Sequence, residues 1–326
     1  MSTLSITLSN SITSEAFPKS DPTPALDLLF SRGKQSSMSS TSILDYWIKK
    51  LIQHQPGEVP ITTLLAKADP KLFNCPYYLC CELVKYTAGM NDVYVRRLSD
   101  IDLITSQSEH YRKLLCEIFE GAVIRHISTW PSLFILGFEN HPNISTINAD
   151  NAELRPMSDV LPEGPQAKFW ISKMNETQMV FHQSNENIAS KDTAQRPNGV
   201  WLWGEGSRLE LPNSPLVVSG QSPELLTLAR AANATVTSYE YIFTTKPTPP
   251  EALIEIQISE DPKSLIQANL IASKALSLLR TGQYSELNIQ TMKNSVIQNT
   301  KCTKYSLHKF WKKTTSALDW LTNNNE

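Results

Sequence analysis

Four side chains that can both donate and accept hydrogen bonds recur at helical spacing near the middle of the chain. They are Asn175, Gln178, His182 and Asn185, which lie three, four and three residues apart. On a helix this spacing places them along one stripe. None of them carries a full charge at neutral pH unless the imidazole is protonated. The stripe predicts recognition of a polar ligand by hydrogen bonds; the alternative is that it satisfies backbone groups in the core.

A second polar and aromatic element follows at Asn198-Gly-Val-Trp-Leu-Trp-Gly-Glu-Gly206. Strand alternation places Trp201 and Trp203 on the same face. Gly204 and Gly206 then permit a sharp turn or the close approach of another backbone. The two tryptophans form either an aromatic wall for a ligand or part of a core, and the sequence leaves both open. A lone Gly-x-Gly is weak evidence for a phosphate site.

Proton-transfer chemistry has two candidate carriers in this stretch, Glu176 and His182. They are six residues apart in sequence, which on a helix separates their directions by about 120°. The sequence therefore does not predict a cooperating acid–base pair. It contains no Gly-x-Ser-x-Gly nucleophile elbow and no His-Glu-x-x-His metal motif, so we expect no metal and no cofactor.

A helix over residues 168–185 and a strand over residues 200–203 must position these groups. Ser222-Pro223 and Asp261-Pro262 mark two later helix starts, because Ser and Asp cap helices and Pro suits their first turn. Residues 252–258 alternate as a strand does. Strands that alternate with helices predict an α/β (or α+β) fold, with flanking helices on a mixed sheet.

The rest of the chain is expected to form an N-terminal lobe and connecting segments. Residues 1–22 are rich in Ser and Thr and predict a disordered lead-in. Residues 23–140 predict an α+β lobe that begins helical and contains a hairpin over residues 77–95. Residues 141–166 predict a connecting loop, and residues 167–326 an α/β lobe. A docking helix is predicted over residues 303–321.

Composition restricts the partners and the compartment. The net charge of −2 gives no general attraction to nucleic acid or anionic membrane, and no apolar run approaches the roughly 20 residues that span a bilayer. Lys301, Lys304, His308 and Lys312 would share a face of the last helix; a solvated face is the alternative to nucleic-acid binding, which we do not expect. The five cysteines include no Cys-x-x-Cys pair, so we expect a cytoplasmic protein in which Cys80 and Cys81 pack as small hydrophobic residues.

One stretch of the chain resembles the RpfE-type bacterial regulatory family. The residues that carry the resemblance are Leu161-Pro162-x-Gly164, Trp170, Asn175-Glu176-x-Gln178-Met179, His182, Asn187 and Asn198-x-x-Trp201-Leu-Trp203-Gly204. A looser similarity extends to residues 24–26, 75–95 and 216–232. The resemblance implies a cytoplasmic bacterial protein linked to the regulation of pathogenicity factors. Its biochemistry is not firmly assigned.

Members of this family are often labelled phosphoglycerate mutase. The label follows from a similar Asn-x-x-Trp-Leu-Trp-Gly-x-Gly segment in the cofactor-independent mutases of archaeal type. An arginine that usually follows the position of Asn187 is missing here, where Ala189 and Ser190 stand nearby, so its anion contact is not carried over.

We therefore expect a regulatory protein that recognises a small polar ligand or a partner protein and does not catalyse a reaction. The alternative is a phosphoglycerate mutase-like or other phosphate-ester enzyme. The predicted ligand-binding residues are Asn175, Glu176, Gln178, His182, Asn185, Asn187, Asn198, Trp201, Trp203, Gly204 and Gly206.

Overall fold

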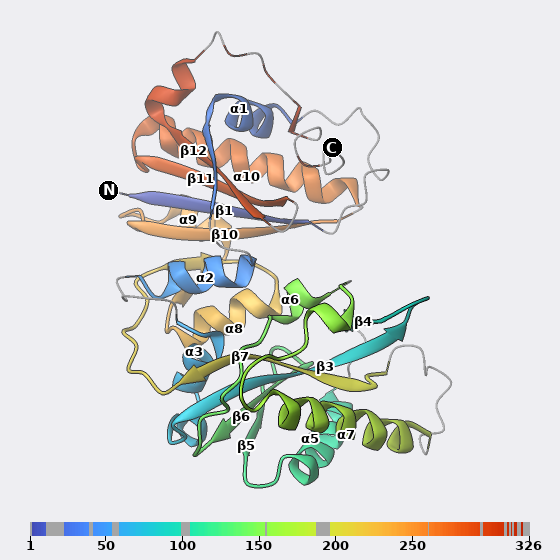
Figure 1. The fold of residues 1–326 in the computed structure, drawn as a ribbon. Helices are drawn as coiled ribbons and strands as arrows, with labels where there is room; N and C mark the ends of the chain where they lie inside the picture. The colour runs from blue at the N-terminus through green and yellow to red at the C-terminus, as the bar shows by residue number, and fades with distance from the viewer. Residues whose placement is uncertain are drawn as a thin grey trace. The chain divides into compact units, whose positions relative to one another are not determined.

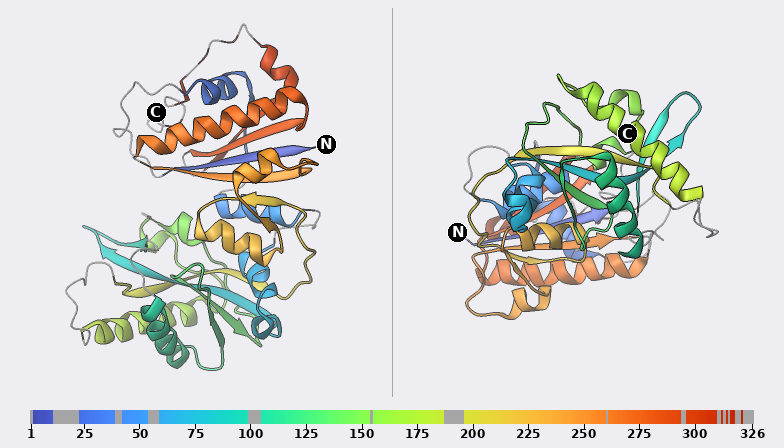
Figure 2. Two further views of the ribbon diagram at one scale, coloured as in Figure 1. Left: turned by 180° about the vertical axis from the view of Figure 1, so that it is seen from behind. Right: turned by 90° about the horizontal axis from the view of Figure 1, so that it is seen from below.

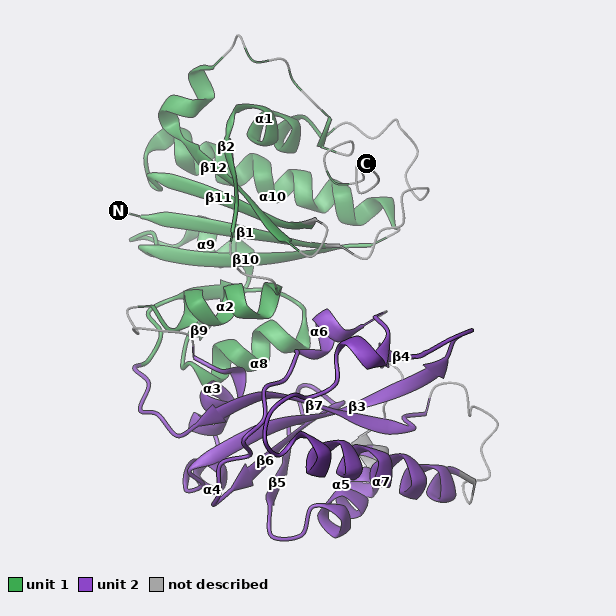
Figure 3. Cartoon of the chain, in the orientation of Figure 1, with its two compact units in different colours: residues 1–53, 213–326 green, residues 54–212 purple. Residues whose placement is uncertain are grey.

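The computed structural model forms two compact units, which are described separately (Figure 3). It describes residues 2–10, 23–38, 42–53, 59–98, 105–153, 155–186, 196–259, 261–293, 296–309, 312, 314, 316, 317 and 321. Unit 1 consists of residues 1–53 and 213–326, and unit 2 of residues 54–212. This division differs from the predicted lobes, because unit 2 lies in sequence between two parts of unit 1. At the two boundaries, residues 53 and 54 and residues 212 and 213, adjoining parts of the chain therefore belong to different hydrophobic cores.

Unit 1 is built on a seven-stranded mixed sheet, which confirms the predicted fold class. Its strands, in spatial order, are β2 (Lys34–Ser37), β12 (Val296–Thr303), β11 (Glu286–Lys293), β1 (Thr3–Asn10), β10 (Glu251–Ile258), β8 (Val217–Ser219) and β9 (Thr235–Val236). From β11 to β9 all neighbours are parallel, whereas β12 is antiparallel to β11 and β2.

Helices cover both faces of this sheet (Figures 1 and 2). Helices α1 (Pro24–Arg32) and α10 (Pro262–Thr281) pack together over one face, and α2 (Ile43–Leu51) and α8 (Pro223–Ala231) over the other. The short helix α9 (Tyr239–Thr244) contacts α10. The predicted caps are present: Ser222 accepts from the Leu225 N–H and Asp261 from the Lys263 N–H.

Strand β1 corrects the prediction of a disordered lead-in. It pairs with β10 and β11 through the centre of the sheet. Leu4, Ile6 and Leu8 are at most 1% exposed and pack into the core beneath α1 and α10. Ser5 and Thr7, on the opposite face, are also buried. The segment is poor in apolar residues, yet its strict alternation suits a strand that needs only one apolar face. Residues 11–22 lie outside the described part of the chain.

Unit 2 contains an antiparallel sheet centred on the long strand β3 (Tyr77–Ala88). The order β4 (Val93–Arg97), β3, β6 (Leu133–Phe138), β5 (Val123–His126) is completed by β7 (Gly199–Ser207), which also pairs with β3. The predicted β3–β4 hairpin is confirmed. Cys80 and Cys81 are fully buried in β3, as expected of small hydrophobic residues.

Helices α5 (Thr105–Ile118) and α7 (Ala167–Glu186) pack against each other and against this sheet. The helix predicted over residues 168–185 is therefore confirmed to within one residue at each end. Helix α3 (Ile61–Lys67) contacts β7, and α4 (Pro70–Phe73) follows it. The predicted connecting loop holds short helical segments, α6 (Ala149–Ala152) and a 3₁₀ helix at Met157–Asp159.

The predicted C-terminal docking helix is wrong over its first turns. Strand β12 continues to Thr303, and Lys304–His308 form a 3₁₀ helix. Lys301 lies in the strand and forms an ion pair with Glu286, so it does not share a helix face with Lys304. Most of residues 310–326 lie outside the described part of the chain. None of the helices described is long and apolar enough to span a membrane.

The placement of β1 predicts that a single truncation there destabilises unit 1. Ile6→Ala should lower the free energy of unfolding by about 2–5 kcal/mol, because it leaves a cavity in a closely packed core. Urea denaturation followed by circular dichroism measures this loss. Lys34→Ala, on the exposed edge strand β2, is the control. Equal effects of the two substitutions would contradict a central β1.

Candidate functional site

The two tryptophans of the motif strand are buried in the core of unit 2. Trp201 is fully buried and Trp203 is 3% exposed. The Trp201 indole donates to the carbonyl of Ile147 over 2.8 Å, and the Trp203 indole to a carboxylate oxygen of Glu82 over 3.1 Å. The sequence left open whether the two indoles line a ligand site or belong to the core, and in the structure both belong to the core.

Glu82 is a fully buried carboxylate on β3, and its partners come from other strands. Arg97 donates to it from β4 over 2.8 Å and reaches Asp150 with a second nitrogen. The Arg97 guanidinium also lies 5.6 Å from the ring centre of Trp130. Burial raises the pKa of Glu82, while the Arg97 charge and the hydrogen bonds from Arg97 and Trp203 partly oppose that rise. The arrangement stabilises unit 2 from within and is closed to a substrate.

Two predicted ligand-binding amides hold backbone groups instead. The Asn198 side chain accepts from the Tyr86 N–H over 2.6 Å and donates to the Tyr86 carbonyl over 2.9 Å. Asn185 accepts from the Tyr111 hydroxyl over 3.0 Å and donates to the carbonyl of Pro197 over 2.9 Å. These bonds use both ends of each amide. They tie Pro197 and Asn198, just before β7, to α7 and β3.

The glycines that follow the tryptophans allow helix α3 to approach β7. Gly204 has a positive φ of 66°. A Cβ added at Gly206 would lie 2.4 Å from the Thr62 hydroxyl oxygen and 2.6 Å from that of Thr63. The Thr62 hydroxyl donates to the Gly204 carbonyl over 2.6 Å. The Gly-x-Gly segment therefore serves packing against α3.

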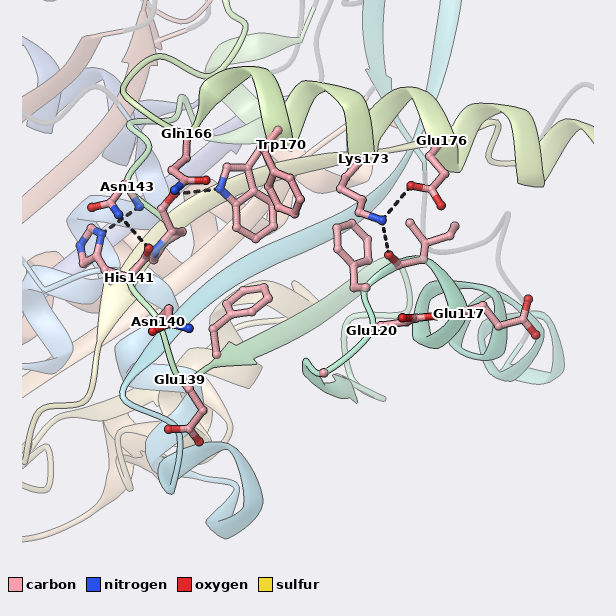
Figure 4. Close-up of a pocket in the computed structure, with 16 residues that line it drawn as sticks. Glu117, Glu120, Glu139, Asn140, His141, Asn143, Gln166, Trp170, Lys173 and Glu176 are labelled. Atoms are coloured by element: carbon pink, nitrogen blue, oxygen red, sulfur yellow. Dashed lines mark hydrogen bonds and ion pairs between the residues drawn. The ribbon is translucent and has the colours of Figure 1, made fainter.

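The rest of the predicted stripe does not converge on a cleft. Asn175 and His182 are exposed on α7, and Gln178 is half-buried. Asn187 lies outside the described residues. Glu176 differs from these, because it lines a groove along the first half of α7 (Figure 4). A ligand-binding role for the exposed stripe residues stays a prediction.

The groove, which we call the α7 groove, has a volume of about 1090 Å³ and is open to solvent. Three segments of unit 2 line it: Glu117–Gly121 at the end of α5, Phe138–Asn143 at the end of β6, and Gln166, just before α7, with Phe169, Trp170, Lys173 and Glu176 on α7. Chain folding brings these segments together from separate positions in the sequence.

Trp170 gives the α7 groove an aromatic base. It is 6% exposed, and its indole donates to the carbonyl of Pro142 over 2.8 Å, which fixes the loop after β6 to α7. Phe119 stacks on it with ring centres 6.4 Å apart, and Phe138 meets it edge-on at 5.3 Å. Phe169 is 51% exposed and presents an aromatic surface to solvent.

The charged lining of the groove is mainly acidic, with four glutamates and one lysine. Glu117, Glu120 and Glu139 are exposed. The single lysine, Lys173, donates to the carbonyl of Ile118 at the end of α5 and to Glu176, in both cases over 2.8 Å. A cation at a helix C-terminus is favourable, so Lys173 fastens α5 to α7.

Unit 1 has a smaller crevice of about 200 Å³ near the carboxyl ends of β8 and β10. In open α/β sheets, ligands commonly bind at this edge, and phosphates often bind at the following helix N-terminus. Here the buried carboxylate of Glu255 accepts from the Gln221 and Ser222 N–H groups, at 3.1 and 3.0 Å. The hydroxyl of Ser9 donates to the same carboxylate over 3.2 Å. The backbone donors at the start of α8 are thus occupied by the protein's own anion.

Metal-ligating side chains do not gather in either unit, as far as the structure describes them. Within the described ranges, no group of three or more His, Cys, Asp or Glu side chains could hold a metal ion.

Sequence reasoning found Trp170 and Glu176 within the relevant stretch but missed most of the groove. Glu117 lies in the last turn of α5, Glu120 follows α5 and Glu139 follows β6, and each looks like an ordinary surface residue in the sequence. The one feature of the sequence that pointed to the groove is the aromatic pair Phe169-Trp170 at the start of a helix, of which Phe169 is exposed. Only the packing of α5, β6 and α7 brings this pair close to the three carboxylates.

No family model matches this chain, and no curated protein matches it. Among solved structures, a cofactor-independent phosphoglycerate mutase from Thermoplasma acidophilum is 14% identical, with 99% of this chain and 95% of that chain covered and a TM-score of 0.46. The PH0037 protein from Pyrococcus horikoshii is 10% identical, with 93% and 87% covered and a TM-score of 0.48. At these identities and TM-scores the two structures give no basis for an activity. The residues and geometry of the α7 groove are therefore the basis for a function.

The hydrogen bond from Trp203 to Glu82 predicts a pH-dependent loss of stability. Trp203→Phe should lower the free energy of unfolding by about 2–4 kcal/mol near neutral pH, because it removes a donor to a buried carboxylate. Burial raises the pKa of Glu82, so the folded protein binds this proton at a higher pH than the unfolded chain does. The cost of burying the charge therefore falls as the pH drops through the folded pKa, and the loss caused by the substitution should shrink with it.

Urea denaturation of the Trp203→Phe protein near neutral pH and near pH 5 measures this change. Trp201→Phe is the matched control, because its indole donates to a neutral carbonyl and its loss should not depend on this titration. The same pH dependence in both variants would argue against a role for Glu82.

The different surroundings of two predicted site residues predict different mutational costs. Asn198→Ala should destabilise the protein by about 1–3 kcal/mol, because it leaves the Tyr86 backbone groups without their partners. Asn175→Ala, at an exposed helix position, should change stability by less than about 0.5 kcal/mol. Thermal and urea unfolding measure both. A large loss from Asn175→Ala would mean that the exposed side chain supports the fold.

Proposed function

We propose that this chain is a cytoplasmic bacterial regulatory protein of the RpfE type that acts by binding a partner in the α7 groove, without catalysing a reaction. The observation that carries the proposal is the groove itself. It joins an aromatic base with exposed carboxylates and contains Trp170 and Glu176 from the stretch that resembles the family. A concave surface with a few polar groups around an apolar base is the usual form of a binding site.

The separation of the two proton carriers that the sequence offered, Glu176 and His182, favours binding over catalysis by them. Glu176 is engaged by Lys173 in an ion pair at 2.8 Å. His182 is an exposed residue further along α7 and does not line the groove. The two candidate proton carriers therefore do not share a substrate position.

The crevice in unit 1 also favours binding over phosphate-ester chemistry. A phosphate at the start of α8 would need the backbone N–H groups of Gln221 and Ser222. Glu255 already accepts from both, and its negative charge would repel an anion at the same place. These two N–H groups are therefore not free to bind a phosphate ester.

Affinity capture with a matched pair of variants tests the proposal. The tagged chain, Phe169→Lys and Met179→Lys should be compared in lysate of the organism that encodes the protein. Phe169 lines the groove, whereas Met179 is a comparably accessible side chain of the same helix, 66% exposed, outside it. We expect a partner that is retained by the unmodified chain and by Met179→Lys and lost with Phe169→Lys, because a charge buried in the contact would disrupt it.

A turnover assay decides against the enzymatic alternative. Purified protein with Mn²⁺ or Mg²⁺ should not interconvert 2- and 3-phosphoglycerate above the rate without protein. Turnover that is abolished by a substitution in this chain, together with no capture that depends on Phe169, would overturn the proposed function.

A further inference from the structure

We infer that the occupant of the α7 groove is a basic segment of a partner protein, with arginine side chains set between apolar ones. The inference rests on the proposed function and adds the chemistry of the partner. Three features of the groove carry it: its charge, the exposure of its aromatic lining, and its extent.

Negative charge is concentrated in the groove. Four carboxylates line it, from Glu117, Glu120, Glu139 and Glu176, and one ammonium, from Lys173, which leaves a formal charge of −3. The whole chain has a net charge of only −2, so the remainder is close to neutral. A local excess of one sign steers and selects a partner of the opposite sign.

Three of the carboxylates are available to such a partner. Lys173 is committed to Glu176 and to the α5 carbonyl. No Lys or Arg in the described ranges pairs with Glu117, Glu120 or Glu139, and all three are exposed. Exposed carboxylates at a rim add modestly to affinity and strongly to selectivity.

The aromatic lining distinguishes arginine from other cations. Phe169 is half exposed beside the groove, and Phe138 is partly buried within it. A guanidinium can stack on an aromatic face while its N–H groups bind a carboxylate. Exposed phenylalanine also favours contact with an apolar side chain of the partner. A surface that is acidic and aromatic together therefore fits a segment that is basic and apolar together.

The extent of the groove favours a peptide over a small amine. Its volume of about 1090 Å³ lies at the upper end of the range for small-molecule sites and exceeds what a single amine or guanidinium group fills. Figure 4 shows Glu139 and Glu117 at opposite ends of the lining, with Trp170 between them in this view. One extended segment can bring a cation to each end and an apolar side chain to the base.

Calorimetry with a defined probe tests the inference on the purified full chain. The probe is a capped peptide in which three arginines alternate with leucine and glycine, and its counterpart has glutamate at the arginine positions. We expect binding of the arginine peptide alone. Its affinity should fall at least about tenfold between low and high salt, because the rim charges are exposed to screening.

Two groove variants and two matched controls locate the binding. Glu117→Gln combined with Glu139→Gln, and separately Phe169→Ala, should each weaken the peptide by about tenfold. Glu210→Gln and Met179→Ala change exposed residues outside the groove and should leave the affinity unchanged. All four changes are at exposed positions, so the folded state is expected to persist, and circular dichroism verifies it.

The opposite results overturn the inference. They are no binding of the arginine peptide, equal effects of groove and control variants, or spermidine binding as tightly as the peptide, which would make the ligand a small polyamine. If a partner is still captured through Phe169 while the peptide fails to bind, the basic chemistry is wrong and the proposed function stands. If neither Phe169-dependent capture nor binding of the arginine peptide is observed, both the inference and the proposed function are rejected.

Discussion

The buried carboxylate of Glu82 is the constraint on which unit 2 depends. An isolated charge in a protein core is costly, so the fold must bring partners to it from elsewhere in the chain. Arg97 comes from the neighbouring strand β4, and the Trp203 indole from β7 on the other side of β3. Arg97 also pairs with Asp150 and so draws α6 to the sheet. The pairing of β3 with β4 on one side and with β7 on the other is what brings these two partners to Glu82.

This constraint also explains why the tryptophan strand, the most recognisable part of the sequence, is buried in the core of unit 2. The indoles of the tryptophan strand are buried and donate to Glu82 and to the Ile147 carbonyl. The glycines after them admit α3, Asn185 binds the Pro197 carbonyl, and Asn198 binds the Tyr86 backbone. The motif residues thus position α7, whose first half presents Trp170 and Glu176 to the groove. Residues of a sequence motif can thus hold the helix that lines a groove without lining the groove themselves.

The same principle operates in unit 1 at Glu255. Its carboxylate lies on β10 beside the central strand β1 and satisfies two backbone N–H groups at the start of α8. Where many α/β proteins accept a bound anion, this unit contains its own. The two units therefore use the buried carboxylates Glu82 and Glu255 for internal structure, while three exposed carboxylates line the α7 groove.

By itself the sequence determined the local structure of this protein. Caps at Ser222 and Asp261, the long helix α7 and the β3–β4 hairpin all follow from patterns within about 20 residues. It placed the stretch that contributes Trp170 and Glu176, but it could not relate them to Glu117 or Glu139. Only the tertiary structure decided that β1 is central, that unit 2 is inserted into unit 1, and that the tryptophans are core. The physical reason is that strand pairing, burial and charge partners join residues far apart in the chain, and alternation or helical spacing carries no record of which partner is chosen.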